Sequence, residues 1–157
     1  MTTAKDARLE MRTRMEGGGL SVPLRWQNEA KDSNGSVELP DTRSPFVYSE
    51  FINEGPEFGR GPSAFGGGAG RNLYRNNARW ESYVFVPKSE GMDRAETIAE
   101  QIAALFRSYR SSGVSCYDAT VYPGGDGADL KPPGLTSEVG NYFWARCEVQ
   151  LTFEQIG

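Results

Sequence analysis

The sequence contains no histidine and only two cysteines. The absence of histidine excludes arrangements in which histidine activates a serine or cysteine nucleophile, and it removes the commonest protein ligand of metals. Cys116 and Cys147 are too few for a disulfide framework or a structural zinc site. Because each cysteine lies in an apolar-rich segment, we expect both to be buried free thiols.

The sequence also lacks a long apolar run and an excess of positive charge. No stretch approaches the ~20 apolar residues of a membrane-spanning helix, and the N-terminal residues 1–15 contain no signal-peptide core. We therefore expect a protein that is used in the cytosol or packaged from it. With 17 basic and 21 acidic residues the net charge is −4, so phosphate neutralisation contributes little to any nucleic-acid binding. A small basic patch at Arg71, Arg75 and Arg79 remains an alternative to a solvated strand face.

Glycine is abundant, at 19 residues, and it concentrates in the stretch GPSAFGGGAG at 61–70. A phosphate-binding loop needs a strand before the glycines and a helix after them, because the helix N-terminus holds the anion. Here strands are expected on both sides, and no phosphate-loop or dinucleotide motif is in register. The stretch is therefore a linker or an arm. The flanking strands favour a flexible glycine-rich arm over residues 55–76.

Acidic residues form no clear site in the sequence. Asp126 and Asp129 lack the third ligand and the distant glutamate of an EF-hand, which favours a solvated turn over a calcium loop. Glu54, Glu57 and Glu90 are scattered through expected loops without an identifiable partner. A glycosidase-like carboxylate pair stays open as an alternative, although nothing in the sequence favours it. We expect no catalytic residue, no metal and no cofactor.

The periodicity of apolar residues predicts one domain over 1–157 with two helices and five strands. Helices are expected over 4–16 and 93–110, with Asp93 and Glu96 as a capping box at the start of the second. Strands are expected over 20–28, 45–53, 72–86, 114–122 and 142–153. This order predicts an α+β fold: an antiparallel-rich mixed sheet, both helices packed on one face, and a long glycine-rich hairpin loop.

Aromatic and arginine side chains outside the expected core are candidates for contacts with other proteins. Trp144 and Arg146 lie on the polar face of strand 142–153, whose other face is apolar. Protein interfaces are enriched in aromatic residues and arginine, although all three tryptophans also fit a core. The candidate interface residues are Phe65, Gly66, Gly67, Gly68, Arg71, Tyr74, Arg75, Arg79, Trp144 and Arg146.

The order of these pieces resembles the tail-terminator-like family of long-tailed phages and related phage-like particles. The resemblance extends over most of residues 4–153. It rests on the N-terminal helix, Trp26-Gln27-Asn28-Glu29, Pro45-Phe46-Val47, Pro87, Gly91, the pattern A-x-x-I-A-x-x-I in a helix ending at Leu105-Phe106, and W-x-x-x-x-V-x-L-x-F in the final strand.

The resemblance implies a structural protein without catalysis. Members form a ring, usually of six subunits, that caps the growing tail tube and offers a surface to the head-proximal connector, with DNA passing through the lumen. The implied partners are further copies of the chain, the tail tube protein and the head–tail connector. The implied location is the head-proximal end of the virion tail, after assembly in the bacterial cytoplasm.

Within this interpretation the glycine-rich arm would cross onto a neighbouring subunit. Two other interpretations stay open. A neck or head-completion protein belongs to the same class. A small carboxylate-based enzyme or ligand-binding domain belongs to a different one.

Overall fold

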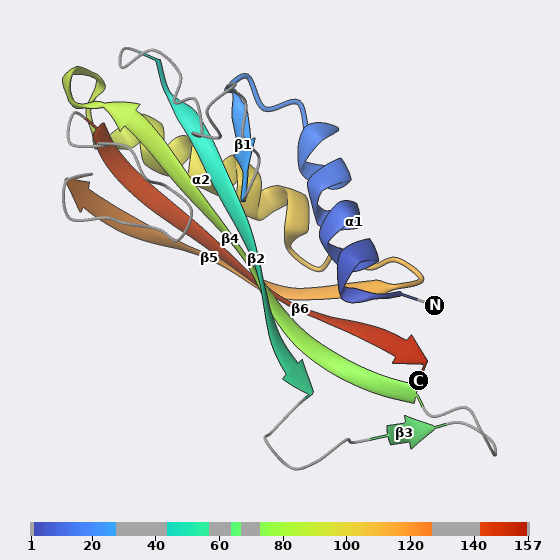
Figure 1. Cartoon of the computed structure of the whole chain (residues 1–157). Helices are drawn as coiled ribbons and strands as arrows, with labels where there is room; N and C mark the ends of the chain where they lie inside the picture. Colours follow the sequence, from blue (N-terminus) through green and yellow to red (C-terminus); the bar gives the residue numbers. More distant parts are fainter. Residues whose placement is uncertain (1, 28–43, 57–63, 67–72, 127–141, 157) are drawn as a thin grey trace, which may run out of the picture.

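The computed structural model describes residues 2–27, 44–56, 64–66, 73–126 and 142–156 (Figure 1). Most of these residues form one twisted sheet and two α-helices. In chain order the elements are α1 (Ala4–Glu16), β1 (Leu24–Trp26), β2 (Phe46–Pro56), β3 (Ala64–Gly66), β4 (Leu73–Pro87), the 3-10 turn η2 (Lys88–Glu90), α2 (Met92–Phe106), β5 (Val114–Asp126) and β6 (Tyr142–Ile156).

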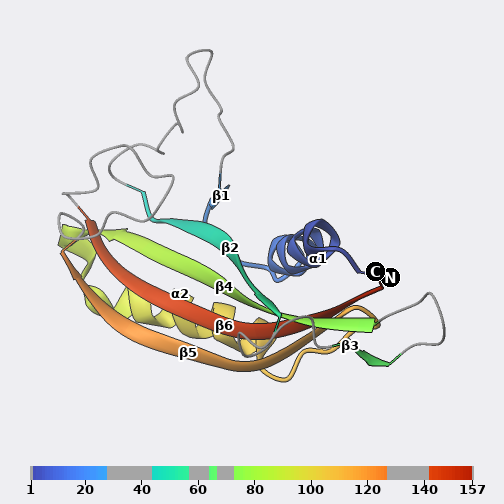
Figure 2. The same ribbon diagram turned by 60° about the horizontal axis from the view of Figure 1, so that its bottom comes forward.

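The main strands lie in the order β1-β2-β4-β6-β5, and the short β3 pairs with one end of β4. β1 runs parallel to β2, and every other described pair is antiparallel. The long strands curve along their length (Figure 2). The expected α+β fold with an antiparallel-rich mixed sheet is therefore confirmed.

Both helices pack on the same face of the sheet, as the sequence predicts. α1 begins with a capping box in which Thr3 accepts from the backbone of Asp6, and it buries Ala7, Met11 and Met15 at intervals of four residues. Its methionines meet side chains of the sheet, with the Met15 sulfur 3.5 Å from the Ser49 hydroxyl. The apolar face of α2 completes this core with Ala95, Ile98, Ala99, Ile102, Ala103 and Phe106.

The ends of α2 differ from the prediction. The N-cap is Gly91, whose φ of 77° few other residues adopt, and no side-chain cap forms, so the capping box expected at Asp93 is wrong. The helix stops at Phe106 rather than at residue 110. Beyond it Ser108 has a φ of 57°, and Tyr109 joins the edge of β5 by accepting from the Cys116 backbone N–H at 2.8 Å.

The strand boundaries also shift. β1 is shorter than expected. It lies at the sheet edge and begins directly after Pro23, where the absence of a backbone N–H on proline breaks no ladder hydrogen bond. β2 and β4 run into the segment predicted as a flexible arm, so residues 55–56 and 73–76 are strand, and β3 occupies residues 64–66. The remaining parts of that segment, 57–63 and 67–72, lie outside the described residues.

The face of the sheet opposite the helices carries a second apolar group, which we call the aromatic cluster. Phe46 and Phe85 stack with ring centroids 4.8 Å apart, and Tyr142 meets Phe46 edge-on at 5.3 Å. Such pairs add about 0.5–1.5 kcal/mol beyond the area they bury. The members of the aromatic cluster are Phe46, Tyr48, Tyr83, Phe85 and Tyr142, with Trp144 packed against them.

Candidate functional site

Three glutamates from three neighbouring strands lie side by side on the helix-free face, directly after the aromatic cluster. Glu50 of β2 pairs opposite Glu81 of β4, and Glu81 pairs opposite Glu148 of β6. Side chains opposite one another in a sheet have Cβ atoms about 4.5–5.5 Å apart, and like charges at such positions repel. This glutamate row therefore requires compensation by nearby donors and cations.

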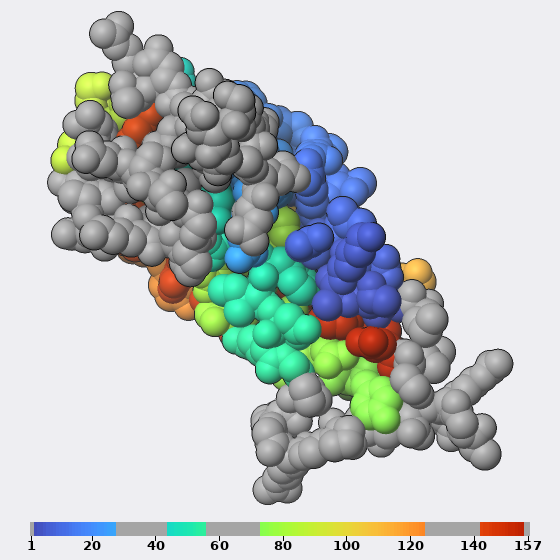
Figure 3. All heavy atoms as spheres, in the orientation of Figure 1, coloured from blue at the N-terminus to red at the C-terminus, as the bar shows by residue number. Residues whose placement is uncertain are grey.

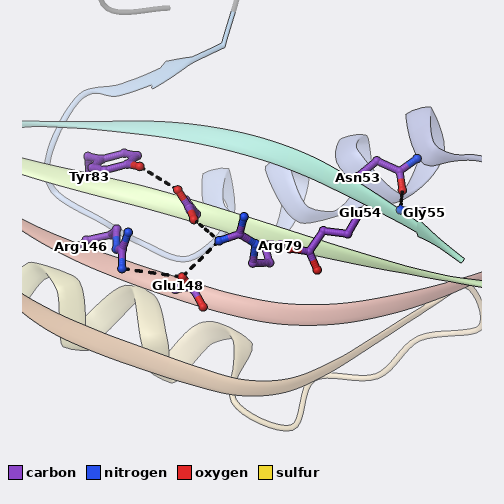
Figure 4. A network of polar contacts seen from close by, with 8 residues as sticks. Asn53, Glu54, Gly55, Arg79, Tyr83, Arg146 and Glu148 are labelled. Carbon is purple, nitrogen blue, oxygen red and sulfur yellow. Dashed lines mark hydrogen bonds and ion pairs between the residues drawn. The ribbon is translucent and has the colours of Figure 1, made fainter. Parts of the chain in front are cut away.

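Arg79 supplies much of this compensation (Figure 4). Its Nε donates to Glu54 at 2.5 Å, its Nη1 donates to Glu81 at 2.8 Å, and the same Nη1 lies 3.6 Å from a Glu148 oxygen. Burial opposes the charge of Arg79, but these carboxylates together hold the pKa of the guanidinium above its usual value. Arg79 thus ties β2, β4 and β6 together from the helix-free side.

Two further side chains complete the network around Glu81 and Glu148. The Tyr83 hydroxyl donates to Glu81 at 2.7 Å. An Arg146 nitrogen lies 3.8 Å from a Glu148 oxygen, and the Arg146 guanidinium lies over the Tyr122 ring, 4.6 Å from its centroid. The side chains of Arg79 and Arg146 are 32% and 31% exposed, so both cations remain within reach of a partner.

Glu50 is the most buried member of the glutamate row, at 1% exposure. Its Oε1 has no hydrogen-bond partner among the described residues. Burial raises the pKa of this carboxyl to about 7; a hydrogen bond from Tyr48 lowers it, and the charge of Glu81 raises it further. Glu50 is therefore partly protonated near neutral pH.

The network carries more negative than positive charge. Two arginines face Glu54, Glu81 and Glu148, which leaves one negative charge in excess while Glu50 is protonated. When Glu50 ionises, the excess becomes two. The face can therefore bind a partner that presents both signs of charge with a surplus of positive charge.

A polar groove of about 400 Å³ continues the same face beyond the network. Arg75 lies in this groove and forms an ion pair with Glu154 at 3.0 Å. The half-exposed Tyr117 reaches the Thr152 hydroxyl at 3.1 Å. The groove residues with polar side chains are Glu54, Arg75, Asn77, Tyr117, Gln150 and Thr152.

The structure brings some of the sequence-predicted interface residues together. Arg79 and Arg146 both contact Glu148, and Arg75 lies on the same face. Trp144 lies two positions before Arg146 in β6, against the aromatic cluster. The others are not part of this site: Tyr74 has the strand parity of the opposite face, Phe65 and Gly66 lie in β3, and Gly67, Gly68 and Arg71 fall outside the described residues.

Sequence reasoning missed the glutamate row itself. Glu148 shares the strand parity of Trp144 and Arg146, but the sequence does not reveal the strand pairing that aligns it with Glu81 and Glu50. Glu54 was expected in a loop without a partner, and this is wrong, because β2 extends past it and Arg79 binds it. The available signal was a glutamate beside an aromatic residue on the same face of each strand: Glu50 with Tyr48, Glu81 with Tyr83, and Glu148 with Trp144.

The cysteines, metal binding and membrane insertion are the remaining functional possibilities among the described residues. Cys116 and Cys147 are buried and free, as expected, and burial raises the pKa of each thiol to about 12. In the described part of the chain, no set of three or more acidic or thiol side chains is placed so that it could hold a metal ion. None of the helices that the structure describes is long and apolar enough to cross a membrane.

Comparisons with known proteins give a fold but no function. No family model matches the chain, and no curated protein matches it. Eight solved chains match in structure. One of them, at 15% sequence identity, aligns over 98% of this chain and 96% of its own with a TM-score of 0.58. At this identity the likeness establishes a shared architecture alone.

Proposed function

We propose that this protein is a structural subunit of a phage tail. In this proposal six copies close into a ring that ends polymerisation of the tail tube and joins the tail to the head–tail connector, at the head-proximal end of the virion. The proposal combines the order of sequence motifs described above with the network on the helix-free face. The observation that carries it is the pairing of two partly exposed arginines, Arg79 and Arg146, with Glu148 on the helix-free face.

Part of the helix-free face is open to a contact between subunits. The aromatic cluster is buried, at 0–6% exposure for its five members, whereas Arg79, Arg146 and the polar groove remain partly exposed. None of the described helices packs on this face. When one patch of each subunit binds a different patch of the next, identical subunits form a closed ring if the rotation between neighbours adds up to a full turn. A mixed-charge face can meet a complementary patch on the next copy and fix its register.

The charge of the chain also suits a ring through which DNA passes. A net charge of −4 releases few counterions from DNA. DNA would therefore pass through the lumen without binding tightly to it. In this proposal one face of the ring binds the tail tube protein and the other binds the connector. A head-completion protein would differ only in which of these two partners it binds.

A carboxylate-based enzyme is the second candidate, favoured by one observation. Glu50 has a pKa of about 7, which suits a general acid at neutral pH. However, Glu50 and Glu81 are only 1% and 4% exposed, so a substrate cannot touch them in this conformation. Assembly therefore accounts for the network better than catalysis does.

Mass photometry of the full chain tests the ring. Six copies of 17.3 kDa give a particle of about 104 kDa, and we expect its population to grow with protein concentration. Arg146→Glu should reduce ring closure at least tenfold, because it leaves Glu148 beside another carboxylate. Arg107→Glu is the matched control, since Arg107 is 51% exposed at the end of α2 and pairs with Glu100.

Tail-tube polymerisation provides the functional readout. Wild-type protein should shorten tubes seen by electron microscopy when it is added to the tube protein, and Arg146→Glu should not. A chain that stays at 17.3 kDa at every concentration and leaves tube length unchanged would exclude the proposal.

A further inference from the structure

A pocket of about 230 Å³ lies on the other side of the molecule, between α1 and the sheet. α1 and β2 lie next to each other on the surface in Figure 3, and residues of both line the pocket. Its apolar walls are Leu9, Trp26, Phe51 and Trp80, and α1 adds Arg8 and Arg12. The Trp26 and Trp80 rings are 5.9 Å apart, so two indoles form one wall.

The indole of Trp80 carries a donor without an acceptor. Trp80 is 2% exposed, and its Nε1 has no hydrogen-bond partner among the described residues. Buried indole N–H groups usually find an acceptor, because leaving the donor unpaired costs about 1–3 kcal/mol. Trp80 lines the pocket, so its indole N–H resonance reports on changes in the pocket wall.

The α1 side of the pocket is cationic. Arg12 pairs with Glu16 at 2.8 Å and lies over the Trp26 ring, 4.9 Å from its centroid. Arg8 forms neither a hydrogen bond nor an ion pair with any residue that the structure describes. The pocket therefore has one compensated cation and one uncompensated cation beside apolar walls. This combination fits a group that is apolar at one end and anionic at the other.

We propose that this pocket binds the C-terminal residue of a partner protein, with an apolar side chain against the two tryptophans and a free carboxylate at Arg8. Its volume is below the ~300–1,000 Å³ of typical small-molecule sites, and it suits a single residue. Capture of a C-terminal carboxylate is an established mode of peptide recognition, and here the Arg8 guanidinium would take the place of backbone donors. The pocket lies on the opposite face from the glutamate row and does not depend on the ring.

NMR of the indole N–H groups provides the test, because the chain has three tryptophans. The probe is acetyl-Ala-Ala-Phe with a free carboxylate, compared with the same peptide as its C-terminal amide. We expect a saturable shift of the Trp80 Nε1–H resonance with the acid. Trp144, on the other face of the sheet, should not shift. The amide should bind at least about tenfold more weakly, because it lacks the charge that Arg8 recognises.

Two variants separate binding from folding. Arg8→Ala removes an exposed side chain and should weaken the acid about tenfold while leaving the rest of the spectrum unchanged. Lys5→Ala, also exposed on α1 but outside the pocket, should bind like wild type.

Three results would overturn the proposal: no saturable Trp80 shift at millimolar peptide, equal binding of acid and amide, or unchanged affinity in Arg8→Ala. N-acetylphenylalanine binding as tightly as the peptide would overturn the assignment to a protein terminus in favour of a small free acid.

Discussion

Replacing Glu50 by glutamine tests the environment of the buried carboxylate directly. In the folded chain burial raises the pKa of Glu50 to about 7 from its ordinary value of 4.5. The hydrogen bond from Tyr48 lowers this pKa and the charge of Glu81 raises it, each by less than burial does. The folded chain therefore holds the Glu50 proton more tightly than the unfolded chain does.

The sign of the pH dependence follows from this difference. Below pH 4.5 the carboxyl is protonated in both states, so burial carries no charge penalty. As the pH rises from 4.5 to 7 the unfolded chain loses its proton first, and the free energy of unfolding falls. Above pH 7 the full penalty is present; at 1.36 kcal/mol per pH unit it reaches about 3 kcal/mol.

Urea unfolding followed by tryptophan fluorescence at pH 5, 6, 7 and 8 measures this penalty. Glutamine has nearly the shape of the protonated side chain but cannot ionise. We expect Glu50→Gln to exceed wild type in stability by less than about 1 kcal/mol at pH 5 and by about 3 kcal/mol at pH 8. Measurements at a concentration where the chain is monomeric keep assembly out of the comparison.

Glu100→Gln is the control, because Glu100 is 55% exposed and pairs with Arg107 on the surface. Its stability relative to wild type should not change between pH 5 and pH 8. A constant difference between Glu50→Gln and wild type across this range would refute the reasoning. So would a variant that is less stable than wild type at pH 8, because Glu50 would then be an ion stabilised by a partner.

Three further outcomes follow from single features of the fold. Thr3→Ala removes the side-chain acceptor at the start of α1 and should lower the free energy of unfolding by about 1 kcal/mol in urea. Gly124→Ala should lower it by about 1–3 kcal/mol, because a Cβ there would lie 1.8 Å from the Trp144 carbonyl oxygen. The buried thiols of Cys116 and Cys147, with pKa values of about 12, should resist a thiol reagent at pH 8 until denaturant is added.

A matched glycine variant separates the effect of the close approach at Gly124 from that of adding a methyl group. Gly17→Ala should be nearly neutral, since Gly17 has an ordinary φ of −79° and an added Cβ meets its nearest atom at 3.4 Å. A Gly124→Ala protein as stable as Gly17→Ala would mean that β5 moves away from β6 easily. Rapid modification of both cysteines in the folded protein would mean that the core opens often.

The sequence predicts best where one periodic pattern decides the structure alone. The bounds of α1 match the expected 4–16, because its apolar spacing ends at a run of three glycines. The alternation from Phe143 to Phe153 places apolar side chains of β6 toward the helices and Trp144 and Arg146 away from them. Such patterns involve neighbours in the chain, so no knowledge of tertiary pairing is needed.

The predictions that fail are those that depend on contacts between distant parts of the chain. The apolar spacing in α2 continues to Tyr109, yet the helix ends at Phe106 because the following residues bind the edge of β5. The glutamate row depends on the registers of two strand pairs, β2 with β4 and β4 with β6, which no single strand encodes. A charged site built across strands becomes visible only when these registers are known.

The position of β6 constrains how the chain reaches its folded state. β6 is the last strand in chain order, but it lies between β4 and β5. A nascent chain that ends before residue 142 holds β4 with one unpaired edge and has no neighbour for β5, so both present open backbone to other chains. The contacts that close the sheet join distant parts of the sequence and form slowly. Until β6 is added, the edges of β4 and β5 are therefore the parts of the sheet most exposed to aggregation.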